Sequence, residues 1–103
     1  MSIPNAKIIH APDPHVVDMI RRRLSSDSRK QLEDIRFDSI ALINAIVPNI
    51  YYFADVAMKS GCVFAADVNG TCPQHTTTLA LFGDVASINA AMDAIEKSIG
   101  NTK

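Results

Sequence analysis

The chain has 103 residues, of which 48% are hydrophobic and 20% are charged, and its formal net charge is -1 at pH 7. These values predict one small soluble domain over residues 1–103, without the excess positive charge that attracts nucleic acid over a distance. No apolar run approaches membrane-spanning length, and the two cysteines, Cys62 and Cys72, do not make a disulfide framework. We therefore expect a cytosolic protein with two free thiols.

The first third of the chain predicts a strand followed by helix. Residues 6–11 are typical of a short strand that stops at Pro12, and Asp13 with Pro14 is typical of a helix start. Helical spacing places four apolar residues of this segment on one face: Val16, Val17, Ile20 and Leu24. The polar residues 25–28 then indicate the start of a short second helix that extends through Leu32 and Ile35.

The middle of the chain predicts the centre of a sheet. Residues 38–47 are apolar on both alternating faces, which is the pattern of a strand buried on both sides. Pro48 and Asn49 end this strand, and residues 50–60 follow with helical spacing up to a stop at Gly61. The residues expected to form the buried stripe of this helix are Ile50, Phe53, Ala54, Ala57 and Met58.

Two further strands and a helix complete the pattern. Residues 62–68 and 76–82 have strand character, and Gly83 with Asp84 closes the second of them and caps the last helix. The apolar face of that helix is expected to consist of Ile88, Met92, Ile95 and Ile99. The order strand, helix, short helix, strand, helix, strand, strand, helix predicts an α/β sandwich, in which helices pack on a sheet that contains antiparallel strands.

A local basic cluster lies between the first two predicted helices. It comprises residues 21–23, which are all arginine, together with Arg29 and Lys30. A solvated face, a contact between subunits and an anion-binding role all fit such a cluster. No aromatic residues are interleaved with it, which disfavours binding of single-stranded nucleic acid.

The turn between the last two strands carries unusual chemistry. It contains Asn69, Gly70, Thr71, Cys72, Pro73, Gln74 and His75, whereas two residues such as Asn-Gly suffice for a tight hairpin. A cysteine followed by proline also occurs in the ligand runs of iron–sulfur proteins. One thiolate cannot hold a cluster, so a metal site here requires several copies of the chain to meet around the turn.

Residues 38–99 resemble the shell domain of bacterial microcompartments, the BMC domain. The segment Ala54-Asp55-Val56-Ala57-Met58-Lys59 is similar to the first-helix signature of that family, and Gly83-Asp84-Val85 leading into an alanine-rich helix is similar to the second. A strand and helix at residues 6–24 precede these signatures instead of following them, which resembles the circularly permuted subclass. We therefore do not expect the barrel that a longer N-terminal segment builds over the pore in permuted relatives.

The resemblance implies a hexameric tile in a cytoplasmic shell, with residues 69–75 of six copies around a central pore. The loop Gly70-Thr71-Cys72-Pro73-Gln74 is similar to that of the divergent shell proteins of glycyl-radical propanediol microcompartments, which are associated with an iron–sulfur cluster. It thereby implies that copies of Cys72 from a ring of six share a 4Fe-4S cluster, which takes four ligands, so that the six thiols cannot all bind equally. Lys59 matches the lysine at the tile edge, although the usual partner arginine is missing from residues 10–14.

The resemblance implies a structural protein that works with other shell proteins and with enclosed enzymes, and not with nucleic acid or a membrane. The cluster would transfer electrons across the shell or supply a cluster to enzymes inside it. Alternatives are a metal-free pore for small metabolites, a zinc site of Cys72 and His75 from several copies, and an enzyme with Cys72 as nucleophile. His75 is expected to ligate, to donate a hydrogen bond to the cluster or to lie in solvent, and Cys62 to be a buried small apolar residue.

Overall fold

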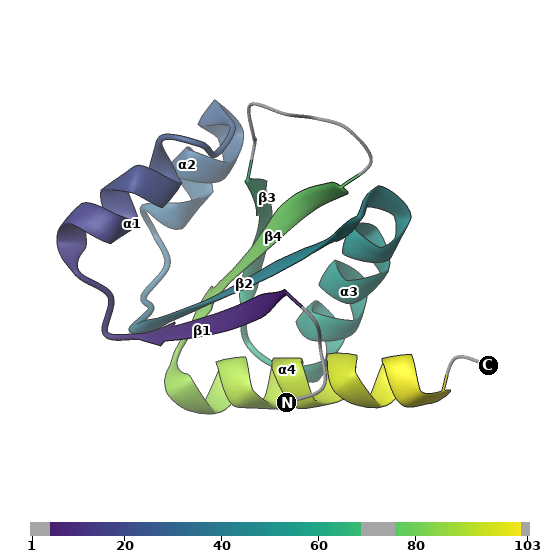
Figure 1. The fold of residues 1–103 in the computed structure, drawn as a ribbon. Coiled ribbons are helices and arrows are strands. Elements are labelled where there is room, and N and C mark those ends of the chain that lie inside the picture. The colour runs from purple at the N-terminus through teal and green to yellow at the C-terminus, as the bar shows by residue number, and fades with distance from the viewer. Residues whose placement is uncertain (1–4, 69–75, 102–103) are drawn as a thin grey trace.

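The computed structural model describes residues 5–68 and 76–101, which form one four-stranded sheet with helices on both faces (Figure 1). The order of elements is the one predicted. The strands are β1 (Ala6–His10), β2 (Ser39–Ile46), β3 (Phe64–Val68) and β4 (Thr76–Gly83). The helices are α1 (Pro14–Arg21), α2 (Ser26–Leu32), α3 (Val47–Ser60) and α4 (Val85–Asn101).

The sheet has the strand order β1-β2-β4-β3, and each neighbouring pair is antiparallel. β2 and β4 pair along their whole length, from Ser39 opposite Gly83 to Ile46 opposite Thr76. β2 therefore lies inside the sheet, as its apolar residues on both faces predict. Ile40 and Ile43 are both completely buried and belong to separate hydrophobic clusters, one on each face.

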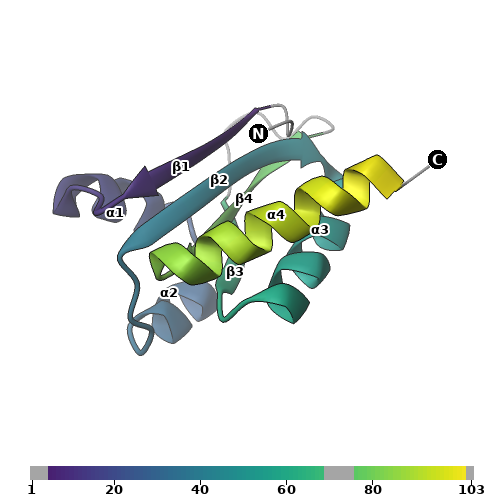
Figure 2. The same ribbon diagram turned by 90° about the horizontal axis from the view of Figure 1, so that it is seen from below.

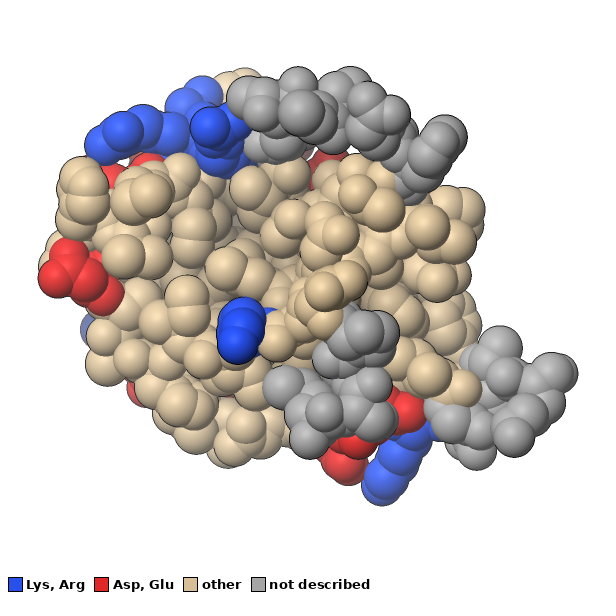
Figure 3. Space-filling model, viewed as in Figure 1, with Lys and Arg blue, Asp and Glu red and all other residues tan. Residues whose placement is uncertain are grey.

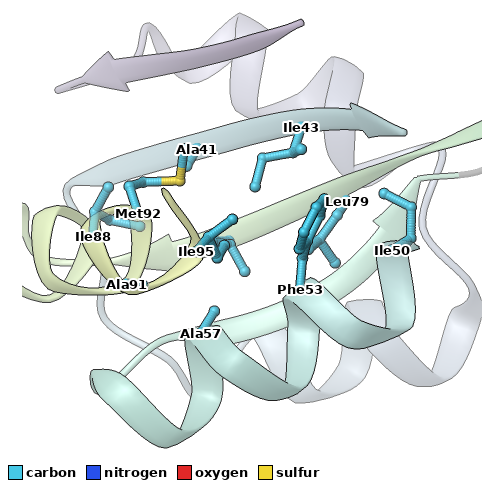
Figure 4. Packing of buried hydrophobic residues seen from close by; sticks show 11 residues of the cluster. Ala41, Ile43, Ile50, Phe53, Ala57, Leu79, Ile88, Ala91, Met92 and Ile95 are labelled. Atoms are coloured by element: carbon cyan, nitrogen blue, oxygen red, sulfur yellow. The ribbon is translucent and has the colours of Figure 1, made fainter. Parts of the chain in front are cut away.

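Helices α3 and α4 lie side by side on one face of the sheet, as Figure 2 shows. Their buried residues interdigitate with those of β2 and β4 in the larger hydrophobic cluster (Figure 4). Ile50, Phe53 and Ala57 of α3 and Ile88 and Ile95 of α4 all belong to this cluster, and all five are buried. The predicted stripes are thus confirmed at these positions, but Met58 is 58% exposed and that part of the prediction is wrong. Met58 follows Ala57 directly, and one residue turns the side chain about 100° around the helix axis, away from the stripe.

Helices α1 and α2 cover the other face. Asp13 caps α1 as predicted, since its Oδ1 accepts a hydrogen bond of 2.8 Å from the backbone N–H of His15. Ser25 caps α2 in the same way through the N–H of Ser28, at 3.1 Å. Helix α2 ends at Leu32, so Ile35 lies beyond the helix that was expected to include it, although it packs against the same cluster. That cluster consists of Leu24, Leu32, Ile40, Ala66, Ala80 and Phe82.

The segment between α3 and β3 differs most from the prediction. The expected strand over residues 62–68 starts only at Phe64, and Cys62 is exposed instead of buried. The chain bends here, and Val63 packs against the larger cluster in the place that Cys62 was expected to take.

At the other end of the helix, Pro48 lies in the first turn of α3, where proline is tolerated because the first N–H groups have no partner within the helix.

Candidate functional site at the turn between β3 and β4

The candidate site lies in the segment that connects β3 to β4. β3 ends at Val68 and β4 begins at Thr76, with Val68 opposite Thr78 in the register. The Thr77 hydroxyl donates a hydrogen bond of 3.5 Å to the carbonyl oxygen of Val68. This bond links the two strands at the end of β3. The seven predicted pore residues, Asn69 to His75 with Cys72 among them, lie outside the described residues, so their roles remain predictions.

Asn44 of β2 fixes the start of β4 beside this turn. Its Nδ2 donates hydrogen bonds to the carbonyl oxygen of Thr77 at 3.1 Å and to Oγ1 of Thr78 at 3.2 Å. A side chain that bridges two strands in this way holds the base of the turn in one register. This role of Asn44 was not predicted from the sequence. The available signal was a polar amide in the otherwise apolar run from Ser39 to Ile46.

The first turn of α3 lies at the end of the sheet where β4 begins (Figure 1). Ile46, the last residue of β2, pairs with Thr76 and directly precedes the helix. The N-terminus of α3 carries no acidic residue in its first turn and no side-chain cap. The positive end of the helix dipole is therefore left uncompensated by side chains of the first turn at this end of the sheet.

Lys59, the predicted tile-edge residue, lies at the end of α3 remote from β2 and from the start of β4. It is in the last turn of α3, about 18 Å along the helix axis from Val47. Its side chain is 74% exposed and forms an ion pair of 2.9 Å with Asp55, one helical turn earlier. An exposed pair of this kind contributes little to stability, which leaves the ammonium available for an external partner. Lys59 therefore lies at the end of α3 remote from Val47, whose neighbour Ile46 pairs with the first residue of β4.

Among residues 5–68 and 76–101, no group of three or more His, Cys, Asp or Glu side chains has a geometry that could hold a metal ion. Cys62 is at the end of α3 opposite to the turn and is exposed. The donor chemistry of the cysteine in the turn fits an iron–sulfur cluster, because thiolates are the usual ligands of such clusters. No helix in the described part of the chain is long and apolar enough to cross a membrane.

Residues 40–103 match the BMC domain family. In the described fold, β1 and α1 come before this segment in the chain. The chain therefore belongs to the BMC-domain family of bacterial microcompartment shell proteins, which are located in the shell in the bacterial cytoplasm. Shell proteins of this family are structural, and they assemble with copies of themselves and with other shell proteins.

Within the family, the chain is similar to two GrpU microcompartment shell proteins. The ligand-free GrpU structure from Pectobacterium wasabiae is 43% identical, with a TM-score of 0.74, and the match covers 88% of this chain and 98% of that one. The GrpU protein from Clostridiales bacterium 1_7_47FAA, also ligand-free, is 30% identical with a TM-score of 0.70, and the match covers 93% of this chain and 92% of that one.

The fused permuted hexameric shell protein MSM0275 of the RMM microcompartment shares the fold at 16% identity, with a TM-score of 0.71. The match covers 97% of this chain and 46% of that one. Its permuted order fits the order found here, in which β1 and α1 precede the segment that matches the family. No curated protein matches the chain.

Proposed function

We propose that six copies of this chain form a shell tile in which the turns at residues 69–75 surround a central pore, and that copies of Cys72 hold an iron–sulfur cluster there. The observation that supports the proposal best is the position of this cysteine. It lies in the turn by which β3 and β4 leave one end of the sheet, in a shell domain 43% identical to a GrpU protein. A ring of copies would bring several thiols together, which a single chain cannot do.

The residues of this chain would hold the cluster as follows. Six thiols around a sixfold axis exceed the four ligands of a 4Fe-4S cluster. Either the ring departs from sixfold symmetry, or three copies of Cys72 bind and one iron takes another ligand. A bound cluster would supply one-electron transfer. Asn44 and the Thr77 hydroxyl would fix the base of each turn, so that the thiols approach the axis on a rigid support.

The proposal includes a cellular role. The cluster would pass electrons across the shell of a glycyl-radical propanediol microcompartment, or it would be delivered to enzymes enclosed in it. The partners would be other copies of this chain, other shell proteins and the enclosed enzymes. We assign no catalytic activity to the chain.

Anaerobic purification tests the cluster directly. We expect a brown protein of about 67 kDa, six times the chain mass of 11.2 kDa, with a cluster signal in the visible absorption and, after reduction, in the EPR spectrum. Cys72→Ser should remove the chromophore and leave the assembly intact. Cys62→Ser is the matched control, because this thiol is exposed at the end of α3 remote from the turn.

The outcomes separate the proposal from its alternatives. A colourless hexamer after reconstitution with iron and sulfide would contradict the cluster and favour a metal-free pore for small metabolites. Zinc bound in place of iron, and lost with Cys72→Ser, would indicate a structural metal site. A monomer on sizing would contradict the tile itself.

A further inference from the structure

A hollow of about 300 Å³ lies between the end of α1 and one face of α2, on the side of the sheet opposite α3 and α4. Ser26, Arg29, Lys30 and Glu33 are spaced so that they share one face of the helical segment, and Asp27 and Arg21 complete the lining. In Figure 3, Lys and Arg side chains gather at the upper left, over α1 and α2. The volume is at the lower end of the range of about 300–1,000 Å³ typical of small-molecule sites.

Arg21 is held at the wall of this hollow with part of its hydrogen-bonding capacity unused. Its Nε is buried and has no hydrogen-bond partner among the described residues. The same side chain also lines a neighbouring hollow, of about 450 Å³, beside Asp18 and Asp38. Neither carboxylate lies within 4 Å as an ion-pair partner. The guanidinium thus borders two open spaces, and no carboxylate in the described part of the chain lies within 4 Å to neutralise it.

Arg29 and Lys30 are in the same situation. Neither forms an ion pair within 4 Å with any residue in the described part of the chain, although Asp27 and Glu33 line the same hollow. Three cationic groups therefore converge on one space without being neutralised at contact distance. Unpaired cations that share a concave site attract an anion, and a guanidinium offers paired donors that match the oxygens of a phosphate group.

We propose that this hollow, between α1 and α2, binds a phosphate group, carried by free phosphate or by a small phosphorylated metabolite. Three cations and two carboxylates give the lining a formal charge of +1, which favours a compact dianion beside the cations over an extended polyanion. The lining contains no aromatic residue on which a base could stack. The site lies apart from the turn at residues 69–75 and is independent of the proposed cluster, so a shell tile would have a second, anion-responsive site.

The proposal is tested by titrating the assembled protein with inorganic phosphate at low ionic strength, followed by calorimetry and by amide chemical shifts. We expect saturable binding with shifts concentrated in α1 and α2. Arg29→Gln should weaken binding about fivefold or more, the scale of one unit-charge interaction at 4 Å in water. Glu33→Gln should strengthen binding, because it removes a carboxylate from the lining.

Arg23→Gln is the matched control, since it removes the same charge from an exposed residue outside the lining, and it should change the affinity less than twofold. Equal losses for Arg23→Gln and Arg29→Gln, or no saturable binding, would overturn the site. Tighter binding of glycerol phosphate than of phosphate would identify a phosphate ester as the ligand, and equal affinity would identify free phosphate. A six-residue aspartate peptide that binds more tightly than either would overturn the preference for a compact dianion.

Discussion

Gly61 ends α3 at a point where the chain passes very close to the start of α4. A Cβ atom at this position would lie 2.8 Å from the backbone oxygen of Ser87, closer than real Cβ contacts allow. The backbone of Gly61 is extended, with φ of -156°, so any residue could adopt it and the constraint is one of space. Glycine is therefore needed here for the approach of the two helices.

We predict that Gly61→Ala lowers the free energy of unfolding by about 1–3 kcal/mol, the usual cost of forcing atoms into packed space. The measurement is urea unfolding followed by circular dichroism. Gly83→Ala is the graded comparison, because its Cβ would be 3.2 Å from Cys62 O and from the movable Cγ1 of Val63. It should cost less. A larger loss for Gly83→Ala would show that the Gly61 contact relaxes.

Asp84 provides a second test, through pH. The backbone N–H of Ser87 donates a hydrogen bond of 2.7 Å to Oδ1 of Asp84, and this bond lowers the pKa of the carboxyl below its ordinary value of 3.8. Because the pKa is lower in the folded state, the ionised carboxylate adds stability that is fully present above the unfolded value. That contribution is lost as the pH falls through the folded value.

We therefore expect Asp84→Asn to lower stability at pH 7 and to lower it progressively less as the pH falls below 3.8, because the unfolded wild-type chain binds the proton before the folded one does. The urea midpoints of both proteins at each pH value give the comparison, and titration of other carboxylates cancels in the difference. Asn can still accept the Ser87 hydrogen bond, so the change isolates the charge. A difference that is independent of pH would contradict the lowered pKa.

Helix α3 shows how one element divides its residues between core and surface. Phe53 is 6% exposed and packs between the sheet and α4, whereas Met58 is 58% exposed in spite of its apolar side chain. We predict that Phe53→Ala lowers the free energy of unfolding by about 3–5 kcal/mol, through lost burial and the cavity that remains. Met58→Gln should change it by less than about 0.5 kcal/mol. A large effect of Met58→Gln on the melting temperature would mean that Met58 is covered in the assembly.

Comparison of several elements shows which parts of the fold can be predicted from the sequence. Asp13 with Pro14, and the apolar pattern of residues 38–47, depend on local chemistry and on a period of two, and both predictions are confirmed. The exposure of Met58 follows from the helical period, which turns its side chain away from the stripe that includes Ala57. The exposure of Cys62 depends on how the end of α3 meets β3, which no local pattern encodes. Met58 and Cys62 are both apolar, so residue type predicted that they are buried, whereas both are exposed.

The candidate site, too, could be predicted from the sequence only in part. The sequence predicts strands on both sides of residues 69–75, and β3, which ends at Val68, and β4, which begins at Thr76, confirm them. The hydrogen bond from Asn44 to Thr77 joins residues that are distant along the chain, and the hollow beside Arg21 is lined by residues of two separate helices. Spacing along the sequence alone could not predict either of them. The order of strands in the sheet, β1-β2-β4-β3, also depends on such long-range pairing.

The permuted order has a consequence for the whole molecule. β1 is an edge strand that pairs only with β2 in the described sheet, and α1 and α2 connect it to β2 across the other face. The sheet therefore does not require β1 to come first in the chain. What it requires is that β1 lies antiparallel to β2, from Ala6 opposite Ile43 to His10 opposite Ser39.

We predict that a circular permutant keeps this fold when residues 103 and 1 are joined by a flexible linker and the chain is opened at residues 34–37, between α2 and β2. Those residues form no strand or helix, and openings in such connections are tolerated. The far-UV spectrum and the assembly size should be unchanged, with a melting temperature lower by several degrees. A permutant opened between Ala41 and Leu42 is the control, and it should not fold, because the break divides the strand that pairs with both neighbours. If the first permutant also failed to fold while the linker was long enough to span the ends, α1, α2 and β2 would have to form as one continuous unit, and the N-terminal position of β1 would be a requirement of this fold.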